Sequence, residues 1–141
     1  MHIEVRLADK GDIEKLHEII AELDECEIGS RDRRFKEALG SGLSSYLVAT
    51  CEGKAVGFIN LWCIPDMVDG GLIGIILDCY VLGEYRSRGV GKMLMEAVMD
   101  FGNQRKVNKY FSWVDPGNKP AISLLKKFGF GAGSLMLEKK E

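Results

Sequence analysis

The stretch "YRSRGVGK" (residues 85–92) places two arginines, two glycines and a lysine between an apolar run and a helix-like pattern. The apolar run "LIGIILDCYVL" (72–82) precedes it, and "VGKMLMEAVMDF" (90–101) follows with apolar residues at steps of three and four. This order predicts a buried strand that turns directly into an amphipathic helix. Flexible backbone and positive charge then lie where helix N–H groups have no internal partner, which favours binding of an anion.

The composition predicts one globular domain (1–141), because 46% of the residues are apolar and 28% are charged. A net charge of −2 argues against a nucleic-acid partner, so any anion site must be local. The four cysteines match neither a zinc site nor a disulfide scaffold, so we expect reduced thiols and no metal. The N-terminus lacks a signal-peptide pattern and no apolar run approaches ~20 residues, so we expect a cytoplasmic protein with no membrane partner.

The patterns along the chain predict an α/β fold with a mixed sheet. The run 72–82 is expected to be its central strand, buried on both faces, and the helix that follows should connect it to a parallel neighbour. The expected elements are a strand over 3–8, a helix from Ile13 to Leu23 capped by Asp9 or Asp12, a helix around Phe35 ending at Gly40, a hairpin of 45–50 and 55–62, a loop over 64–71, the strand 72–82, the helix 90–101, a strand over 109–114, a helix from near Pro120 to Gly129, and a strand over 134–138.

A second motif, "NKPAISLLKKFGF" (118–130), lies about thirty positions downstream of the glycine turn. Together with "YVLGEYRSRGVGK" (80–92) it resembles the GNAT family of N-acetyltransferases, whose patterns V-x-P-x-x-R-x-x-G-x-G and N-x-x-A-x-x-x-Y-x-x-x-G-F bind acetyl-coenzyme A. Gly83 stands where the family often has proline. The resemblance extends over about residues 3–138 and implies a single-domain GNAT-like acyl-CoA N-acyltransferase fold, with a mixed central sheet flanked by helices.

The resemblance implies that acetyl-coenzyme A is a co-substrate held by this turn and by the strand before it. The backbone amide of Cys79 would donate to the thioester carbonyl and stabilise the oxyanion, and Val81 would present backbone groups to the pantetheine arm. Asn118 would bond near the pantetheine or cap its helix, or both, and Ala121 would leave room for the cofactor. The full set implied for cofactor binding is Cys79, Val81, Arg86, Ser87, Arg88, Gly89, Val90, Gly91, Lys92, Asn118, Ala121 and Leu125.

The general acid and base are less evident in the sequence. Leu125 stands where the family often has a tyrosine that acts as general acid, and leucine cannot donate a proton. Tyr80 and Tyr110 are candidates in its place, and packed aromatic side chains are the alternative interpretation of both. Asp78 is the one charge within the run 72–82, which makes it either a catalytic base or a carboxylate with a structural partner.

Three further residues are interpreted as structural. A single histidine such as His17, next to an apolar stripe, is expected at a solvated helix edge. Asp115 is expected to form a turn. Cys79 is disfavoured as a covalent nucleophile because no histidine is placed beside it, so direct attack by the amine is the simpler scheme.

The sequence therefore predicts an acetyl-coenzyme A dependent N-acetyltransferase that transfers acetyl directly to a primary amine of a small molecule or a peptide. In GNAT-like proteins, two segments that carry acidic residues commonly border the acceptor site. Their acids would suit a cationic amine, and ordinary solvated surface charge is the alternative interpretation of the same residues, namely Glu25, Glu27, Asp66 and Asp69. Because of Leu125, a non-catalytic acyl-coenzyme A sensor is the alternative. A homodimer paired through the sheets is compatible with the resemblance.

Overall fold

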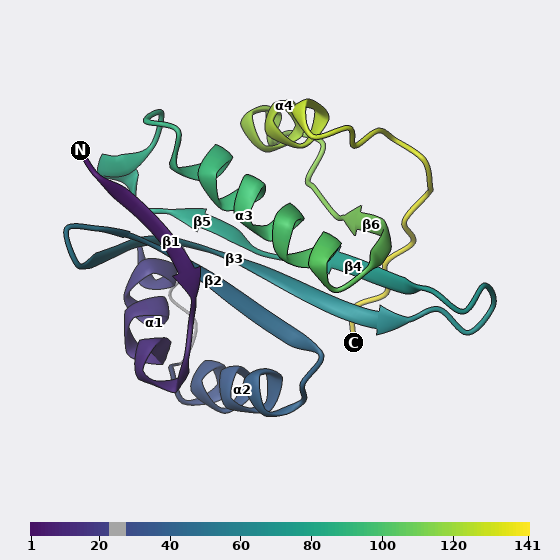
Figure 1. The fold of residues 1–141 in the computed structure, drawn as a ribbon, viewed down its shortest axis with the longest axis horizontal. Coiled ribbons are helices and arrows are strands. Elements are labelled where there is room, and N and C mark those ends of the chain that lie inside the picture. Colours follow the sequence, from purple (N-terminus) through teal and green to yellow (C-terminus); the bar gives the residue numbers. More distant parts are fainter. Residues whose placement is uncertain (23–27) are drawn as a thin grey trace.

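The computed structural model describes residues 1–22 and 28–141, which form a mixed sheet with helices on both faces (Figure 1). The α/β fold class expected from the sequence is confirmed. The predicted helix end at Leu23, the thiol of Cys26, and the acidic residues Glu25 and Glu27 lie outside the described residues. Within the described part of the chain, no helix is both long and apolar enough to cross a membrane.

The sheet has the strand order β1-β2-β3-β4-β6, and β5 also pairs with β3. The described strand pairs are antiparallel except for β4 and β6, which are parallel and connected by α3. This confirms the expected crossover and the expected hairpin of β2 and β3. The strands are β1 (Ile3–Leu7), β2 (Ser44–Cys51), β3 (Lys54–Pro65), β4 (Leu72–Ile76), β5 (Cys79–Val81) and β6 (Val107–Ser112).

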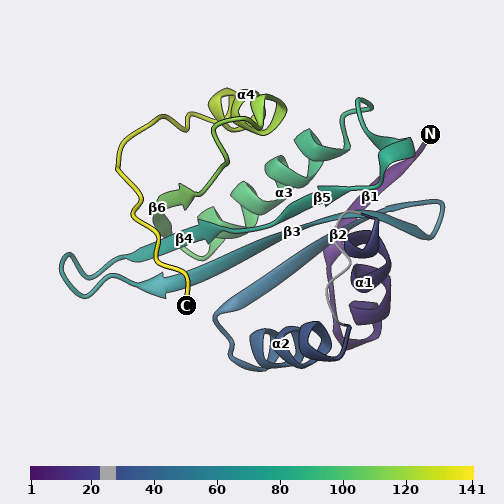
Figure 2. The ribbon, with the colours of Figure 1, turned by 180° about the vertical axis from the view of Figure 1, so that it is seen from behind.

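Two pairs of helices cover the two faces of the sheet (Figures 1 and 2). α3 and α4 cover one face, where Val90, Leu94 and Val98 of α3 enter the larger apolar core. α1 and α2 cover the other face, where Leu16 and Ile19 pack into a second core. The helices are η1 (Lys10–Asp12), α1 (Ile13–Ala21), α2 (Ile28–Gly40), the short η2 (Gly83–Tyr85), α3 (Val90–Gln104) and α4 (Lys119–Lys127).

The run 72–82 is two strands rather than the single strand expected. Both strands pair with β3, but they do so in different registers. Ile75 of β4 is paired with Trp62, and Cys79 of β5 is paired with Ile59. Between these two pairs, β3 has two residues, whereas the segment from β4 to β5 has three, residues 76–78. This one-residue bulge separates β4 from β5 and reverses which side chains of the second strand face α3.

The central strand is β3, which corrects the expectation for 72–82. β3 is buried continuously from Val56 to Leu61, whereas Leu77 in the bulge is 41% exposed. The reason is position, because β3 has β2 on one side and both β4 and β5 on the other. β3 also continues to Pro65, so the expected loop over 64–71 begins later.

The expected strand over 134–138 is absent, since these residues pair with no strand in the structure. Leu135 and Leu137 are each 84% exposed. The segment consists of a short apolar run between a glycine-rich stretch and charged residues, and it passes round the sheet without bonding to an edge (Figure 1). An apolar run alone cannot supply the neighbouring strand that its N–H and C=O groups need.

The two candidate caps before α1 have different roles. Asp9 caps the short η1 that leads into α1, because its Oδ1 accepts a hydrogen bond from the amide of Gly11 (2.8 Å), whereas Asp12 is the N-cap residue of α1 without a side-chain cap bond. Asp12 is buried and bonds through both carboxylate oxygens to the guanidinium of Arg6, at 2.8 Å each. Arg6, and to a smaller extent the amide of Asp9, lower the pKa of Asp12 to about 2 against the opposing effect of burial.

We expect Asp12→Asn to destabilise the fold at neutral pH and to flatten the loss of stability in acid. A carboxyl whose pKa is lowered on folding stabilises the protein above its unfolded pKa, and that stabilisation is lost as the pH falls from about 4 towards about 2. Arg6 is 46% exposed, so water screens the pair and we expect roughly 1–2 kcal/mol. Urea unfolding between pH 7 and pH 2 measures this. Glu4→Gln, at an exposed carboxylate, is the control, and equal curves for both variants would contradict the assignment.

Candidate functional site

Strand β5 pairs with β3 along one edge. Its other edge is open in the described part of the chain, because β6 pairs with β4 and not with β5. The amide of Leu82 donates to the carbonyl of Val56 in β3 at 2.8 Å. Backbone groups alternate in direction along a strand, so those of Cys79 and Val81 point away from β3. They face the side of the sheet on which β6 lies beside β4 (Figure 1).

The turn that follows β5 brings the first amides of α3 to the same end of the sheet. Ser87 and Gly89 have left-handed backbone conformations, with φ of 61° and 83°. The amide of Met93 donates to the carbonyl of Gly89 at 3.0 Å, so the amides of residues 90–92 point out of the helix end. A Cβ on Gly89 would meet no heavy atom within 4 Å. Such a group of amides fits a diphosphate.

Arg88 and Lys92 add positive charge beside these amides. Both side chains are exposed. The amino group of Lys92 lies 3.9 Å from Glu96, and Arg88 lies 3.8 Å from the sulfur of Met1. Exposed contacts of this kind contribute little free energy, so both side chains are able to turn towards an anion.

Arg86 supports the turn from within. Its amide donates to the carbonyl of Gly83 (3.2 Å), and its Nε donates to the carbonyl of Val81 (2.9 Å). Glu22, just after α1, accepts the amide of Gly83 (2.6 Å) and lies 3.9 Å from the guanidinium of Arg86. Arg86 thus occupies the carbonyl of Val81, and the amides of Cys79 and Val81 remain directed outwards. No pattern in the sequence indicated this role of Glu22.

Helix α4 carries the second motif beside α3. Asn118 caps it, because its Oδ1 accepts from the amide of Ala121 at 3.3 Å, so the structural interpretation of Asn118 is confirmed. Ala121 and Leu125 are half-buried, and Leu125 packs against the core shared with α3. A Cβ on Gly91 would lie 3.4 Å from Leu124, so the start of α3 and the middle of α4 are close neighbours.

Asp78 and Cys79 follow the bulge and point to opposite faces of the sheet. Burial raises the pKa of Asp78. Burial and then the Asp78 charge raise the pKa of Tyr46, on the face covered by α1 and α2, to about 12. Cys79 is an exposed residue, but desolvation of its thiol by the surrounding protein, followed by the charge of Asp78, raises the pKa of that thiol. A neutral thiol is a poor nucleophile, which agrees with direct attack by the amine.

The two tyrosines considered as proton donors lie in different places. Tyr80 packs against Phe58 with ring centroids 5.5 Å apart, in the core beneath α1. The hydroxyl of Tyr110 donates to Oδ1 of Asn103 at 2.9 Å, near the C-terminal end of α3. A helix rises about 1.5 Å per residue, so this hydroxyl is about 20 Å from Gly89. Tyr110 therefore forms its hydrogen bond at the opposite end of α3 from the glycine turn, and its role as the acid stays a prediction.

His17 and Asp115 have structural partners. His17 is 7% exposed rather than at a solvated helix edge, because α2 packs over it. Its Nε2 lies 3.3 Å from Asp32, and its ring contacts Phe35 with centroids 5.2 Å apart. Asp115 forms the expected turn by accepting the amide of Gly117 at 2.8 Å.

The acidic residues between β3 and β4 accept hydrogen bonds within the turn that contains them. Asp66 accepts the amide of Val68 (3.0 Å), and Asp69 accepts the amide of Gly71 (2.8 Å). The backbone hydrogen bonds hold the pKa of Asp66 below its usual value. Lys109 lies within 3.9 Å of both carboxylates. Both carboxylates therefore have partners within the protein, so their presence in this turn does not require an acceptor amine.

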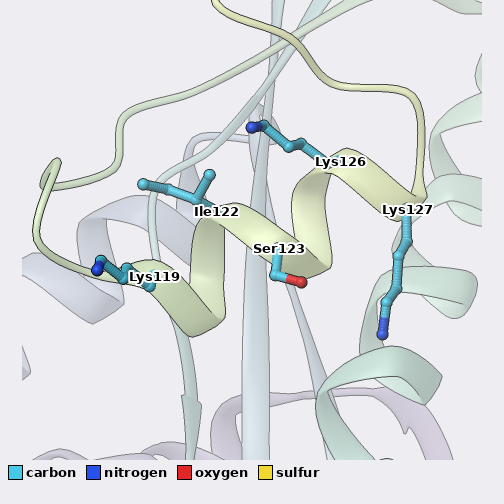
Figure 3. Close-up of a pocket in the computed structure, with 5 residues that line it drawn as sticks. All are labelled: Lys119, Ile122, Ser123, Lys126 and Lys127. Atoms are coloured by element: carbon cyan, nitrogen blue, oxygen red, sulfur yellow. The ribbon is translucent and has the colours of Figure 1, made fainter.

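A surface hollow of about 480 Å³ lies along the outer face of α4 (Figure 3). Its lining residues recur every three or four positions, so they form a single helix face. Lys126 and Lys127 point in different directions, and the amino groups do not converge on one ligand position (Figure 3). The residues around the hollow are Lys119, Ile122, Ser123, Lys126 and Lys127.

Among the described residues, no group of three or more acidic, histidine or cysteine side chains is arranged to hold a metal.

The arrangement of open strand edge, glycine turn and helix end agrees with a comparison to known families. The model of the acetyltransferase (GNAT) family matches residues 13–130. The chain belongs to the GNAT family. An N-acetyltransferase of Archaeoglobus fulgidus, itself uncharacterized, is 29% identical to this GNAT chain over 126 residues, covering 82% of the chain and 84% of the relative.

Further relatives support an N-acetyltransferase enzyme. An N-alpha-acetyltransferase of Sulfolobus acidocaldarius is 35% identical over 109 residues, which span 68% of this GNAT chain and 61% of that protein. The aminoglycoside acetyltransferase AAC(6')-Iy, solved with a bisubstrate analogue that contains coenzyme A, has a TM-score of 0.86 with 21% identity. That alignment covers 100% of this chain and 99% of the other. The structural likeness confirms the GNAT fold.

Proposed function

We propose that this GNAT protein uses acetyl-coenzyme A to acetylate a primary amine by direct transfer. The observation that carries the proposal is that two sets of backbone amides point outwards at the same end of the sheet. Those of Cys79 and Val81 lie on the open edge of β5, and those of residues 90–92 begin α3 a few residues later. The GNAT family match and the relatives named N-acetyltransferases support it.

The residues present fit acetyl-coenzyme A, which would supply the activated acetyl thioester. The amides of residues 90–92 would hold the diphosphate, with Arg88 and Lys92 nearby. The outward amides of Cys79 and Val81 would bind along the pantetheine arm. The amide of Cys79 would donate to the thioester carbonyl oxygen, where negative charge develops. Ala121 would leave space for the arm beside α4.

Asp78 is the proposed base for the acceptor amine. An amine of the lysine type has a pKa of about 10.4, so it must lose a proton before it can attack. Burial raises the pKa of Asp78, which makes its carboxylate a stronger base than one in water. The departing thiol has an ordinary pKa of about 8.5, so water can protonate it although Leu125 cannot.

Thiol release in the presence of amines tests the proposal. We expect release above the no-acceptor rate with at least one class of polyamines, aminoglycosides, amino acids or peptides, and mass spectrometry should find the acetylated amine. Calorimetry with acetyl-coenzyme A is the companion measurement. Binding without release across that panel would favour the second candidate, an acyl-coenzyme A sensor. The half-buried Leu125, which has no proton to donate, is the observation that favours the sensor.

A further inference from the structure

Asn60 is a buried amide in the middle of the apolar strand β3. It is 0% exposed. Its Nδ2 donates to Oγ of Ser44 (2.8 Å) and to the carbonyl of Ser45 (3.3 Å), both in β2. A carbonyl accepts but cannot donate, so the contact with Ser45 fixes which end of the amide faces β2. The side-chain carbonyl of Asn60 therefore points away from β2, and no described group bonds to it.

Asp78 is the neighbour of Asn60 on the opposite side. The backbone amide of Asn60 donates to the carbonyl of Asp78 at 2.9 Å, at the end of the bulge. Residues paired in this way across antiparallel strands carry their side chains on the same face, with Cβ atoms about 5 Å apart. Tyr46, on the other side of Asn60, is paired with it in β2. The three polar side chains therefore form a row across the sheet.

We propose that Asn60 is a positioning residue for Asp78, whose protonated carboxyl donates a hydrogen bond to the side-chain carbonyl of Asn60. This bond gives the buried carbonyl its missing partner. An unpaired buried acceptor destabilises the fold, and a carboxylate beside it would leave two acceptors facing each other. The bond thus favours the neutral form of Asp78 and fixes the orientation of the carboxyl beside the bulge.

The electrostatic surroundings of Asp78 agree with this arrangement. Burial raises its pKa. The pKa values of Tyr46 and Cys79 are also raised, so both groups are neutral where a carboxyl titrates. On the buried face of α1 the ionisable group is His17, which bonds to Asp32 of α2 rather than to β5. α3 packs on the other face of β5 with apolar side chains.

The inference rests on the proposed function for its meaning in catalysis, but the bond itself does not depend on it. As the pH rises, Asp78 releases its proton to solvent and becomes the carboxylate that serves the acceptor amine. Asn60 then sets the pH at which this base appears. The first sign of the residue in the sequence is an amide within the apolar run "AVGFINLW" (55–62).

The test is a titration of Asp78 in the full chain by NMR, with ¹³C at the aspartate carboxyls and Asp78→Asn to assign the signal. We expect Asn60→Leu to lower the midpoint of Asp78 by about one pH unit, because it removes the acceptor that favours the neutral form. Ser44→Ala is the matched control, since it removes a partner of Nδ2 and leaves the carbonyl of Asn60 in place. It should leave the midpoint unchanged.

A second variant covers the case in which Asn60→Leu does not fold. Asn60→Asp keeps the shape of the side chain and adds a carboxyl beside Asp78, so the two should titrate in two separated steps. A wild-type midpoint in Asn60→Leu, or independent titration in Asn60→Asp, would overturn the proposal. Both readouts are free of activity, so they stand if the protein proves to be a sensor. In an active enzyme, the acid limb of the pH profile of kcat/KM should move with the midpoint.

Discussion

Gly89→Val is expected to weaken the binding of acetyl-coenzyme A at least tenfold. Gly89 has φ of 83°, a conformation that costs a residue with a side chain roughly 1–2 kcal/mol. The strained turn would shift the amides of residues 90–92, and the new side chain would occupy the open space beside residue 89. Each hydrogen bond lost to a charged group costs about 1.5–3 kcal/mol, and about 1.4 kcal/mol is tenfold in affinity. Titration calorimetry measures the loss.

Gly42→Val is the matched control for backbone strain. Gly42 has φ of 74°, and at Gly42, as at Gly89, an added Cβ would meet no heavy atom within 4 Å. Gly42 belongs to the connection between α2 and β2, and this connection lies away from the start of α3 (Figure 1). Both variants should lose similar stability in thermal unfolding, and only Gly89→Val should lose affinity. Equal affinity in the two folded variants would remove the glycine turn from the binding site.

Asp78→Asn is expected to lower kcat by about 10²–10⁴, the usual contribution of a positioned base. Asparagine has nearly the same shape, so the affinity for acetyl-coenzyme A should not change. In the wild type, activity should rise with pH as Asp78 loses its proton, at a pH above that of an ordinary aspartate because burial raises its pKa. The residual activity of the Asp78→Asn variant should not show this rise with pH.

Asp115→Asn is the control for Asp78→Asn. Its carboxylate accepts a backbone amide in a turn, and an asparagine oxygen can do the same. This variant should retain wild-type kcat. If Asp78→Asn also kept kcat within a factor of about three, the base would be another group, since a positioned base contributes far more than that.

Local sequence patterns predicted those parts of the fold that depend on neighbouring residues. The period of Val90, Leu94 and Val98 predicted α3 because a helix repeats every 3.6 residues. The Gly53 turn between two apolar runs predicted the hairpin of β2 and β3. The glycine turn at 86–92 was predicted at the start of a helix, and its left-handed residues lie there.

Other features depend on contacts between distant residues, which no local pattern contains. The bulge after Ile76 is a mismatch of one residue against β3, and the apolar run that contains it is continuous in sequence. The exposed side chain of Arg86 bends back onto the turn because the carbonyl of Val81 and the carboxylate of Glu22 lie within its reach. The role of Asn60 requires knowing that Asp78 lies across from it.

An NMR titration of the ¹⁵N-labelled full chain with acetyl-coenzyme A tests the proposed binding site. In the proposed complex, backbone amides at the start of α3 and on the open edge of β5 hold this molecule. We expect the amides of Cys79, Val81 and residues 90–92 to show the largest shifts, and we expect these shifts to saturate together. Saturable binding that leaves these amides unmoved, with the largest shifts elsewhere, such as on α4, would contradict the proposed site.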